Sequence, residues 1–224
     1  MLNLTYRVNP QLLLPDLPKG LELDLLGHTA HVSLVAFEFI DTRVKGFKVP
    51  FHINFPEVNL RYYANYKGKR GVVFLREFVP RYCIALIADE LYNEPYQAIA
   101  MNCKTQITAN ELRVCHDLRK DRTRFSIEVS AETRLVTPAE TSLEHYFKEH
   151  DVGFGKDKFG NTLLYRVEHP VWEIYPIREY KLNLDFGLLY GTRWRFLNDR
   201  QPLCALLAKG SFVKVFHPQK LENF

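Results

Sequence analysis

The chain has 224 residues, of which 46% are hydrophobic and 25% charged, and its net charge is +4. Such a composition predicts a globular protein, and the length fits a single domain over residues 1–224. The weak positive charge gives no reason to expect a nucleic-acid partner. No apolar run approaches the roughly 20 residues of a membrane helix, and residues 1–7 lack a signal-peptide pattern. We therefore expect a cytoplasmic protein with no membrane partner.

The cysteine and histidine spacing gives no sign of a metal centre. The four cysteines are scattered, and no Cys-x-x-Cys pair occurs, which excludes a zinc ribbon and a thioredoxin motif. His28 and His31 are three residues apart, so on a strand their side chains would face opposite sides. We expect neither a metal nor a cofactor.

Alternation of polar and apolar residues predicts strands along most of the chain. After a short helical piece that begins at Asn9 and Pro10, the strands are expected at 21–25, 30–39, 57–66, 72–78, 98–108, 112–118, 122–136, 163–168, 180–185 and 205–216. Because strands and helices do not alternate regularly, the fold class is α+β with a mainly antiparallel sheet, and parallel βαβ units are not expected.

Two longer helices are predicted, at 81–92 and at 138–149. The first follows Pro80 and repeats apolar residues at helical spacing. The second begins with Thr137 as the cap, Pro138 in the first turn and Glu140 completing a capping box. His145 and His150 come near its end, where we expect them on the surface.

The stretch from residue 52 to residue 63 carries the most chemical information. Along the strand that begins after Pro56, Val58 and Leu60 point to one side, whereas Glu57, Asn59 and Arg61 point to the other. The polar side is either the solvent face of a half-buried strand or the lining of a cavity. In a cavity, Arg61 could bind a carboxylate, and Glu57 could accept hydrogen bonds from Arg61.

The same stretch carries a family resemblance. The string at 54–61, with Asp41-Thr42-Arg43 upstream and residues 90–96, 164–166 and 169–172 downstream, resembles a bacterial family of unknown function. That family is placed in the acetoacetate-decarboxylase-like superfamily, and the resemblance covers nearly the whole chain. It implies a mainly antiparallel, barrel-like β-structure with a few helices around it and a pocket inside.

The resemblance implies the fold without the decarboxylation mechanism. Acetoacetate decarboxylases carry a Pro-Lys-Lys turn whose second lysine forms a Schiff base. Here the corresponding turn is Pro95-Tyr96-Gln97, and neither Tyr96 nor Gln97 can form an imine. The resemblance matches Glu57 to a pocket glutamate of the superfamily. Lys104, further along, is the alternative amine if a lysine-dependent decarboxylase or aldolase were present.

These observations predict a protein that binds an unknown small molecule in a polar internal pocket. The expected ligand-binding residues are Glu57, Asn59, Arg61, Tyr96 and Gln97, with His52 at the pocket mouth. The ligand would bear a carbonyl or a carboxylate, and no catalytic residue is assigned. The alternative is a non-catalytic structural or protein-interaction module with a vestigial pocket. The sequence is compatible with a homo-oligomer.

Overall fold

The computed structural model describes residues 1–44, 47–48, 53–80 and 95–221. The helix predicted at 81–92 and the candidate residue His52 lie outside these ranges. The strands are β1 (Leu2–Val8), β2 (Glu22–Leu23), β3 (Ala30–Phe39), β4 (Arg43–Val44), β5 (Phe47–Lys48), β6 (Phe55–Tyr66), β7 (Lys69–Val79), β8 (Tyr96–Ala98), β9 (Ala100–Ile107), β10 (Leu112–Lys120), β11 (Thr123–Ala131), β12 (Val152–Lys156), β13 (Thr162–Glu168), β14 (Ile174–Tyr175), β15 (Ile177–Asn183), β16 (Cys204–Ala208), β17 (Lys214–Val215) and β18 (Gln219–Lys220). The helices are η1 (Pro10–Leu12), α2 (Leu143–Lys148), α3 (Phe186–Tyr190) and η2 (Thr192–Asp199).

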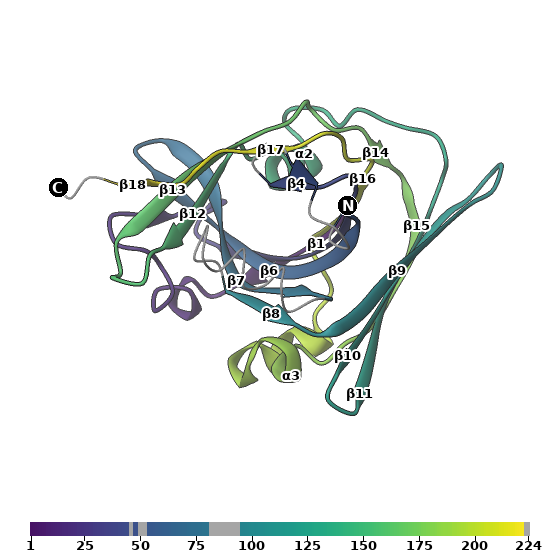
Figure 1. Ribbon diagram of the computed structural model, residues 1–224, viewed down its shortest axis with the longest axis horizontal. Helices are drawn as coiled ribbons and strands as arrows, with labels where there is room; N and C mark the ends of the chain where they lie inside the picture. The colour runs from purple at the N-terminus through teal and green to yellow at the C-terminus, as the bar shows by residue number, and fades with distance from the viewer. Residues whose placement is uncertain (45–46, 49–52, 81–94, 222–224) are drawn as a thin grey trace.

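A large curved sheet forms the body of the protein. Its strands run in the order β14-β16-β1-β3-β6-β7-β12-β13-β17, and most neighbours are antiparallel; β7 pairs in parallel with β12 and β8. Figure 1 shows the sheet bending around α2, which lies inside the curve, while α3 lies outside it. The sheet curves like part of a barrel without closing. The predicted α+β class with a mainly antiparallel sheet is therefore confirmed.

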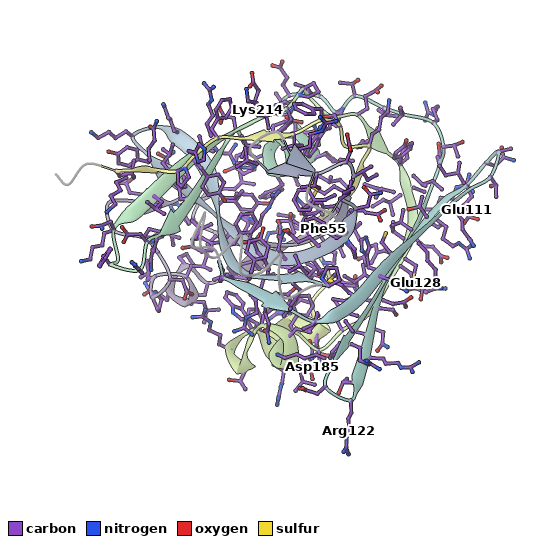
Figure 2. All side chains as sticks on the ribbon, viewed as in Figure 1. Phe55, Glu111, Arg122, Glu128, Asp185 and Lys214 are labelled. Atoms are coloured by element: carbon purple, nitrogen blue, oxygen red, sulfur yellow. The ribbon has the colours of Figure 1, made fainter. Side chains whose placement is uncertain are left out.

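The outer side of the curve carries the main apolar core. Val58, Leu60 and Tyr62 of β6 are fully buried there, together with apolar side chains of β1 and β3. The four-stranded sheet β15-β11-β10-β9 contributes Phe125, Ile127 and other apolar residues to the same core. In Figure 2, Glu111 and Arg122 mark the two ends of this smaller sheet, away from Phe55 inside the curve. The core thus lies between the two sheets.

Helix α2 is shorter than the sequence predicts. It spans Leu143–Lys148, and its cap is Ser142, whose side chain accepts a hydrogen bond from the backbone N–H of His145 at 3.2 Å. The predicted start at Thr137 and Pro138 is wrong because the preceding Val136 is held extended by a bridge to Ile174. Helix formation begins only where a second capping residue is available.

No helix among the described residues is long and apolar enough to cross a membrane.

Candidate functional site

Polar side chains gather on the inner side of the curved sheet. Asn59 lies opposite Glu77 on one neighbouring strand, and Arg61 lies opposite Ser33 on the other. Cross-strand partners share a face, so these strands present one continuous set. We call this set the polar face; its members are Asn3, Thr5, Ser33, Glu57, Asn59, Arg61, Tyr63 and Glu77.

The polar face is covered. Glu57 and Asn59 each expose 1% of their surface, Tyr63 exposes 2%, and only Arg61 is partly exposed. The interpretation of this side as a solvent face is therefore wrong. Burying so many polar groups lowers the stability of the fold unless each group has a hydrogen-bond partner. The hydrogen-bond partners of each group therefore matter to the stability of the fold.

A bulge decides which residue of β7 joins the polar face. From Tyr66 to Arg61 the hairpin pairs regularly, so that Arg61 lies opposite Phe74, but the register shifts between Leu60 and Arg61. Because of that shift Glu77, rather than Arg76, lies opposite Asn59. A one-residue shift moves every following side chain to the other face of a strand. The bulge therefore brings a second carboxyl group beside Glu57.

Glu57 is the centre of a hydrogen-bonded group. Its Oε1 accepts from Nδ2 of Asn59 at 2.8 Å, and its Oε2 accepts from the hydroxyl of Tyr96 at 3.3 Å. Glu77 also hydrogen-bonds to it. Burial raises the pKa of Glu57, while these hydrogen bonds and the nearby positive charge of Arg61 act in the opposite direction.

Strand β8 places Tyr96 at this carboxylate. It pairs in parallel with β7, so that Tyr96 lies beside Glu77 and Gln97 lies beside Phe78. Because successive residues on a strand alternate, Gln97 shares the side of Phe78, which bears the apolar core. The structure therefore brings Tyr96, but not Gln97, to Glu57.

The carbonyl of Phe147 fixes α2 to the polar face. It accepts hydrogen bonds from Asn3 Nδ2 at 3.2 Å and Tyr63 Oη at 3.3 Å, and a longer contact of 3.5 Å from Arg61 Nη2. The last carbonyls of a helix lack intrahelical partners, so side chains of the sheet can take their place. The end of α2 is thereby held over the polar residues.

His150 follows α2 and is buried, so its predicted surface position is wrong. Its ring packs on Tyr63 with 5.0 Å between ring centroids. Burial, and then the positive charge of Arg61, lower its pKa well below the ordinary value. The imidazole is therefore neutral at pH 7 and can both donate and accept one hydrogen bond.

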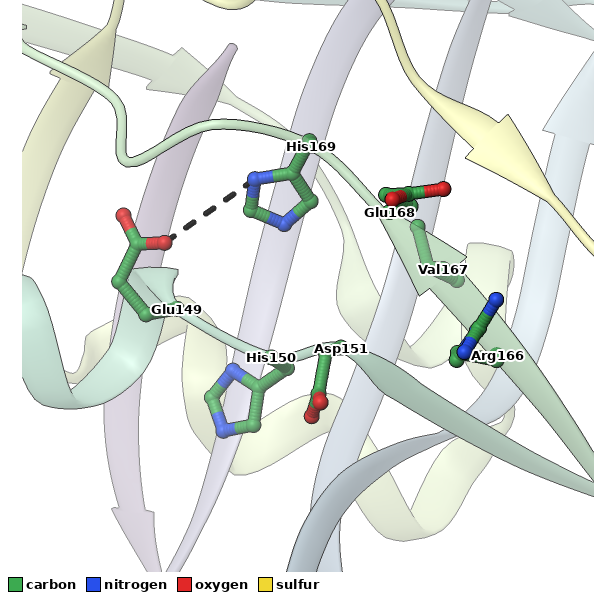
Figure 3. Close-up of a pocket in the computed structure, with 7 residues that line it drawn as sticks. All are labelled: Glu149, His150, Asp151, Arg166, Val167, Glu168 and His169. Atoms are coloured by element: carbon green, nitrogen blue, oxygen red, sulfur yellow. Dashed lines mark ion pairs between the residues drawn. The ribbon is translucent and has the colours of Figure 1, made fainter.

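A hollow of about 360 Å³ lies on the far side of His150. Its lining residues are Glu149, His150, Asp151, Arg166, Val167, Glu168 and His169. In Figure 3 Glu149 points to His169, 4.0 Å away, and His150 and Asp151 lie below this pair. His150 thus separates the hollow from Tyr63 and the polar face.

Several buried atoms of this region have no hydrogen-bond partner among the described residues. They are Oδ1 of Asn59, Nε of Arg61, and both Nδ1 and Nε2 of His150. A buried polar atom without a partner costs roughly 1–3 kcal/mol, and such atoms are uncommon in folded proteins. These four atoms, two of His150 and one each of Asn59 and Arg61, are thus polar groups of the site that no described residue satisfies.

The other sequence candidates lie apart. Lys104 is exposed on β9, opposite Cys115, and is no member of the polar face. Glu77, Ser33 and His150 belong to the site although the sequence analysis did not select them. Lys148 was missed as well: it is buried and forms an ion pair with Glu149. Among the described residues no group of His, Cys, Asp and Glu could hold a metal ion.

A protein-family model matches nearly the whole chain. Residues 1–211 match the model of DUF2071, described as an uncharacterised conserved protein. Among curated proteins, the uncharacterised protein YqjF of Bacillus subtilis (strain 168) is 33% identical over 92 residues, which are 41% of this chain. That match spans only 38% of the length of YqjF.

Solved structures share the fold at low sequence identity. The enduracididine biosynthesis enzyme MppR complexed with pyruvate has a TM-score of 0.67 at 14% identity, covering 99% of this chain and 87% of MppR. An acetoacetate decarboxylase-like enzyme from Sphingomonas wittichii RW1 has a TM-score of 0.64 at 14% identity, covering 100% and 91% of the two chains. Acetoacetate decarboxylase from Legionella pneumophila has a TM-score of 0.60 at 12% identity, with 99% and 84% covered. The protein therefore has the acetoacetate-decarboxylase-like fold.

Proposed function

The chain belongs to the DUF2071 family of uncharacterised conserved proteins, and from its fold and its buried polar face we propose that it binds a small carbonyl- or carboxylate-bearing molecule. One observation carries this proposal: atoms of Asn59, Arg61 and His150 are buried without partners among the described residues. A ligand that supplied those hydrogen bonds would remove their desolvation cost.

The available atoms match a small anion with a second polar group. Arg61 keeps its guanidinium beside the polar face and has Nε available, so it can bind a carboxylate through two N–H groups. Oδ1 of Asn59 can accept a hydrogen bond, and the neutral His150 can donate one to a carbonyl oxygen. We propose that such a molecule enters from the hollow on the other side of His150.

Two of the structurally similar proteins point to the same class of ligand. MppR was solved in complex with pyruvate, and the Legionella enzyme is named for acetoacetate. Both molecules are short keto acids that carry one carboxylate and one ketone. By the family resemblance, Tyr96 and Gln97 stand where the decarboxylases have their lysine pair, so we propose binding of a keto acid without a Schiff base at that turn.

Thermal denaturation with a ligand panel tests the proposal. The panel consists of pyruvate, 2-oxobutyrate and acetoacetate, with lactate and propionate as analogues without the ketone. A ligand at 100 times its Kd stabilises the folded state by about 2.7 kcal/mol, so a keto acid should raise the Tm of the wild type in a saturable way.

Variants at Arg61 separate binding from folding. Arg61→Ala should lose the ligand-induced rise in Tm. Arg61→Lys should lose most of it, because an ammonium group cannot form the bidentate hydrogen bond that a guanidinium forms with a carboxylate. Arg113→Ala, an exposed arginine that pairs with Glu111, should respond like the wild type. A panel that leaves the Tm of the wild type unchanged would overturn the proposal and favour a non-catalytic module. An unchanged response of Arg61→Ala would remove Arg61 from the site.

A further inference from the structure

Two carboxyl groups meet at the centre of the polar face. Glu57 and Glu77 come from neighbouring strands, each exposes 1% of its surface, and they hydrogen-bond to each other. The bulge between Leu60 and Arg61 is what turns Glu77 to this side. This contact is therefore specific to the observed register and would not exist in a regular hairpin.

The contact between Glu57 and Glu77 bears on how many protons the pair holds. A hydrogen bond between two carboxyl groups requires a proton on one of them, because two ionised carboxylates would repel strongly in a buried site. Glu57 already accepts hydrogen bonds from Asn59 and Tyr96. One proton shared by the pair leaves one negative charge beside Arg61, and the hydrogen bonds that Glu57 accepts from Asn59 and Tyr96 suit a carboxylate at that position.

A carboxylate, a neutral carboxylic acid and a phenol in one buried site are suited to proton transfer at carbon. In the handling of ketones, a carboxylate can remove a proton next to the carbonyl while neutral O–H donors stabilise the oxygen that becomes negative. Here Glu57 would be the base, and the O–H groups of Glu77 and Tyr96 would be the donors.

We propose that Glu57 and Glu77 form a general acid–base pair that exchanges a proton at the carbon next to the ketone of a bound keto acid. The step rests on the proposed function. Glu57 takes the proton, the C–H electron pair forms the C=C bond of the enolate, and the former carbonyl oxygen takes the negative charge. Glu77 and Tyr96, whose O–H groups face Glu57 before the substrate binds, turn them to that oxygen and donate hydrogen bonds to it. The proton on Glu57 is replaced by one from water, and its return to carbon restores the ketone, so the exchange needs water but no oxidant or reductant.

Exchange of the methyl protons of pyruvate in D2O measures this step directly. The wild type should remove the methyl signal from the proton NMR spectrum faster than buffer alone. Glu57→Gln removes the base while keeping the shape, and exchange should fall by about 10²-fold or more. Glu77→Gln leaves an amide in place of the acid and should slow exchange less. Tyr96→Phe, which keeps the half-buried ring and removes only the hydroxyl, should slow it several-fold.

Binding is measured on the same samples by the rise in Tm with pyruvate. Glu57→Gln should still be stabilised by pyruvate, because Arg61 remains. A wild type that binds pyruvate without exchanging its protons would overturn the acid–base proposal and leave the binding proposal standing. Equal exchange rates in the wild type and in Glu57→Gln would also overturn the acid–base proposal without affecting the binding proposal. A wild type that binds no keto acid would overturn both.

Discussion

Tyr63 and Phe147 join the curved sheet to helix α2. The hydroxyl of Tyr63 donates to the carbonyl of Phe147 at 3.3 Å, and their ring centroids are 5.3 Å apart. The same hydroxyl hydrogen-bonds to Ser33 on β3. This contact places the end of α2, and His150 after it, over the polar face.

Tyr63→Phe removes these hydrogen bonds while keeping the ring. Because the hydroxyl is buried and its partners would be left without it, the free energy of unfolding should fall by about 1–3 kcal/mol. Urea denaturation measures the change. Tyr180→Phe is the matched control, since that hydroxyl hydrogen-bonds to Gln201 at an exposed site, and it should change stability by less than about 0.5 kcal/mol. Equal effects of the two variants would contradict the role of Tyr63.

Arg70 holds α2 at Tyr146, the residue before Phe147. Its Nε lies 2.7 Å from Oδ2 of Asp24, and its guanidinium stacks on the ring of Tyr146 at 3.6 Å. Arg70→Lys loses the Nε–H donor to Asp24 and the planar group that stacks on Tyr146, and should destabilise the protein by about 1 kcal/mol in thermal or urea denaturation. Arg113→Lys, whose pair with Glu111 is exposed, should have almost no effect. A loss in Arg113→Lys as large as in Arg70→Lys would show that the stacking contributes nothing.

Buried histidines predict that stability falls in mild acid. Burial lowers the pKa of His31, that of His116 to about 4, and that of His150 well below its ordinary value. Between pH 7 and pH 5 the unfolded chain binds protons that the folded protein does not. The free energy of unfolding should therefore fall as the pH falls, by up to about 1.4 kcal/mol per pH unit for each histidine.

His150→Asn isolates one of these contributions. The variant should lose less stability than the wild type between pH 7 and pH 5, whereas His28→Asn, at an exposed position, should follow the wild type. Comparison between variants also cancels the effect of Glu57, whose raised pKa favours the folded state as the pH falls. An identical pH dependence in His150→Asn and the wild type would mean that His150 is not neutral in the folded protein.

Gly153 is required by a close approach between two strands. It lies opposite Tyr165, and a Cβ at this position would lie 2.1 Å from Cζ of that ring. Gly153→Ala should therefore lower the free energy of unfolding by about 1–3 kcal/mol. Adding Tyr165→Ala removes the clash, so the double variant should lose less stability than the sum of the two single variants. Additive losses would contradict this explanation.

Much of the fold was predictable because strand alternation is a local signal. The strand expected at 30–39 coincides with β3, and those expected at 57–66 and 72–78 correspond to β6 and β7. Strand β12 was missed because Gly153 and Gly155 are typical of chain breaks. Their real role, as the structure shows for Gly153, is to let an aromatic ring approach the backbone. That role depends on a strand distant in sequence and leaves no local pattern.

The site was predictable only along one strand. Alternation alone groups Glu57 with Asn59 and Arg61, and the structure places all three on one covered face. Glu77 could not be selected, because regular pairing of the hairpin would have placed Arg76 opposite Asn59. His150 could not be selected either, since its burial arises from the packing of α2 on Tyr63. Both omissions reflect tertiary packing rather than local sequence.

The central claim is that Arg61 and His150 bind a small keto acid, and NMR observation of both side chains tests it most directly. The protein is labelled with ¹⁵N, and pyruvate is titrated while the Nε–H signal of Arg61 and the ring signals of His150 are followed. We predict that both shift and saturate at the same pyruvate concentration, while Nε–H of Arg70, which is paired with Asp24, stays in place. Signals of Arg61 and His150 that do not move at any pyruvate concentration would contradict the claim.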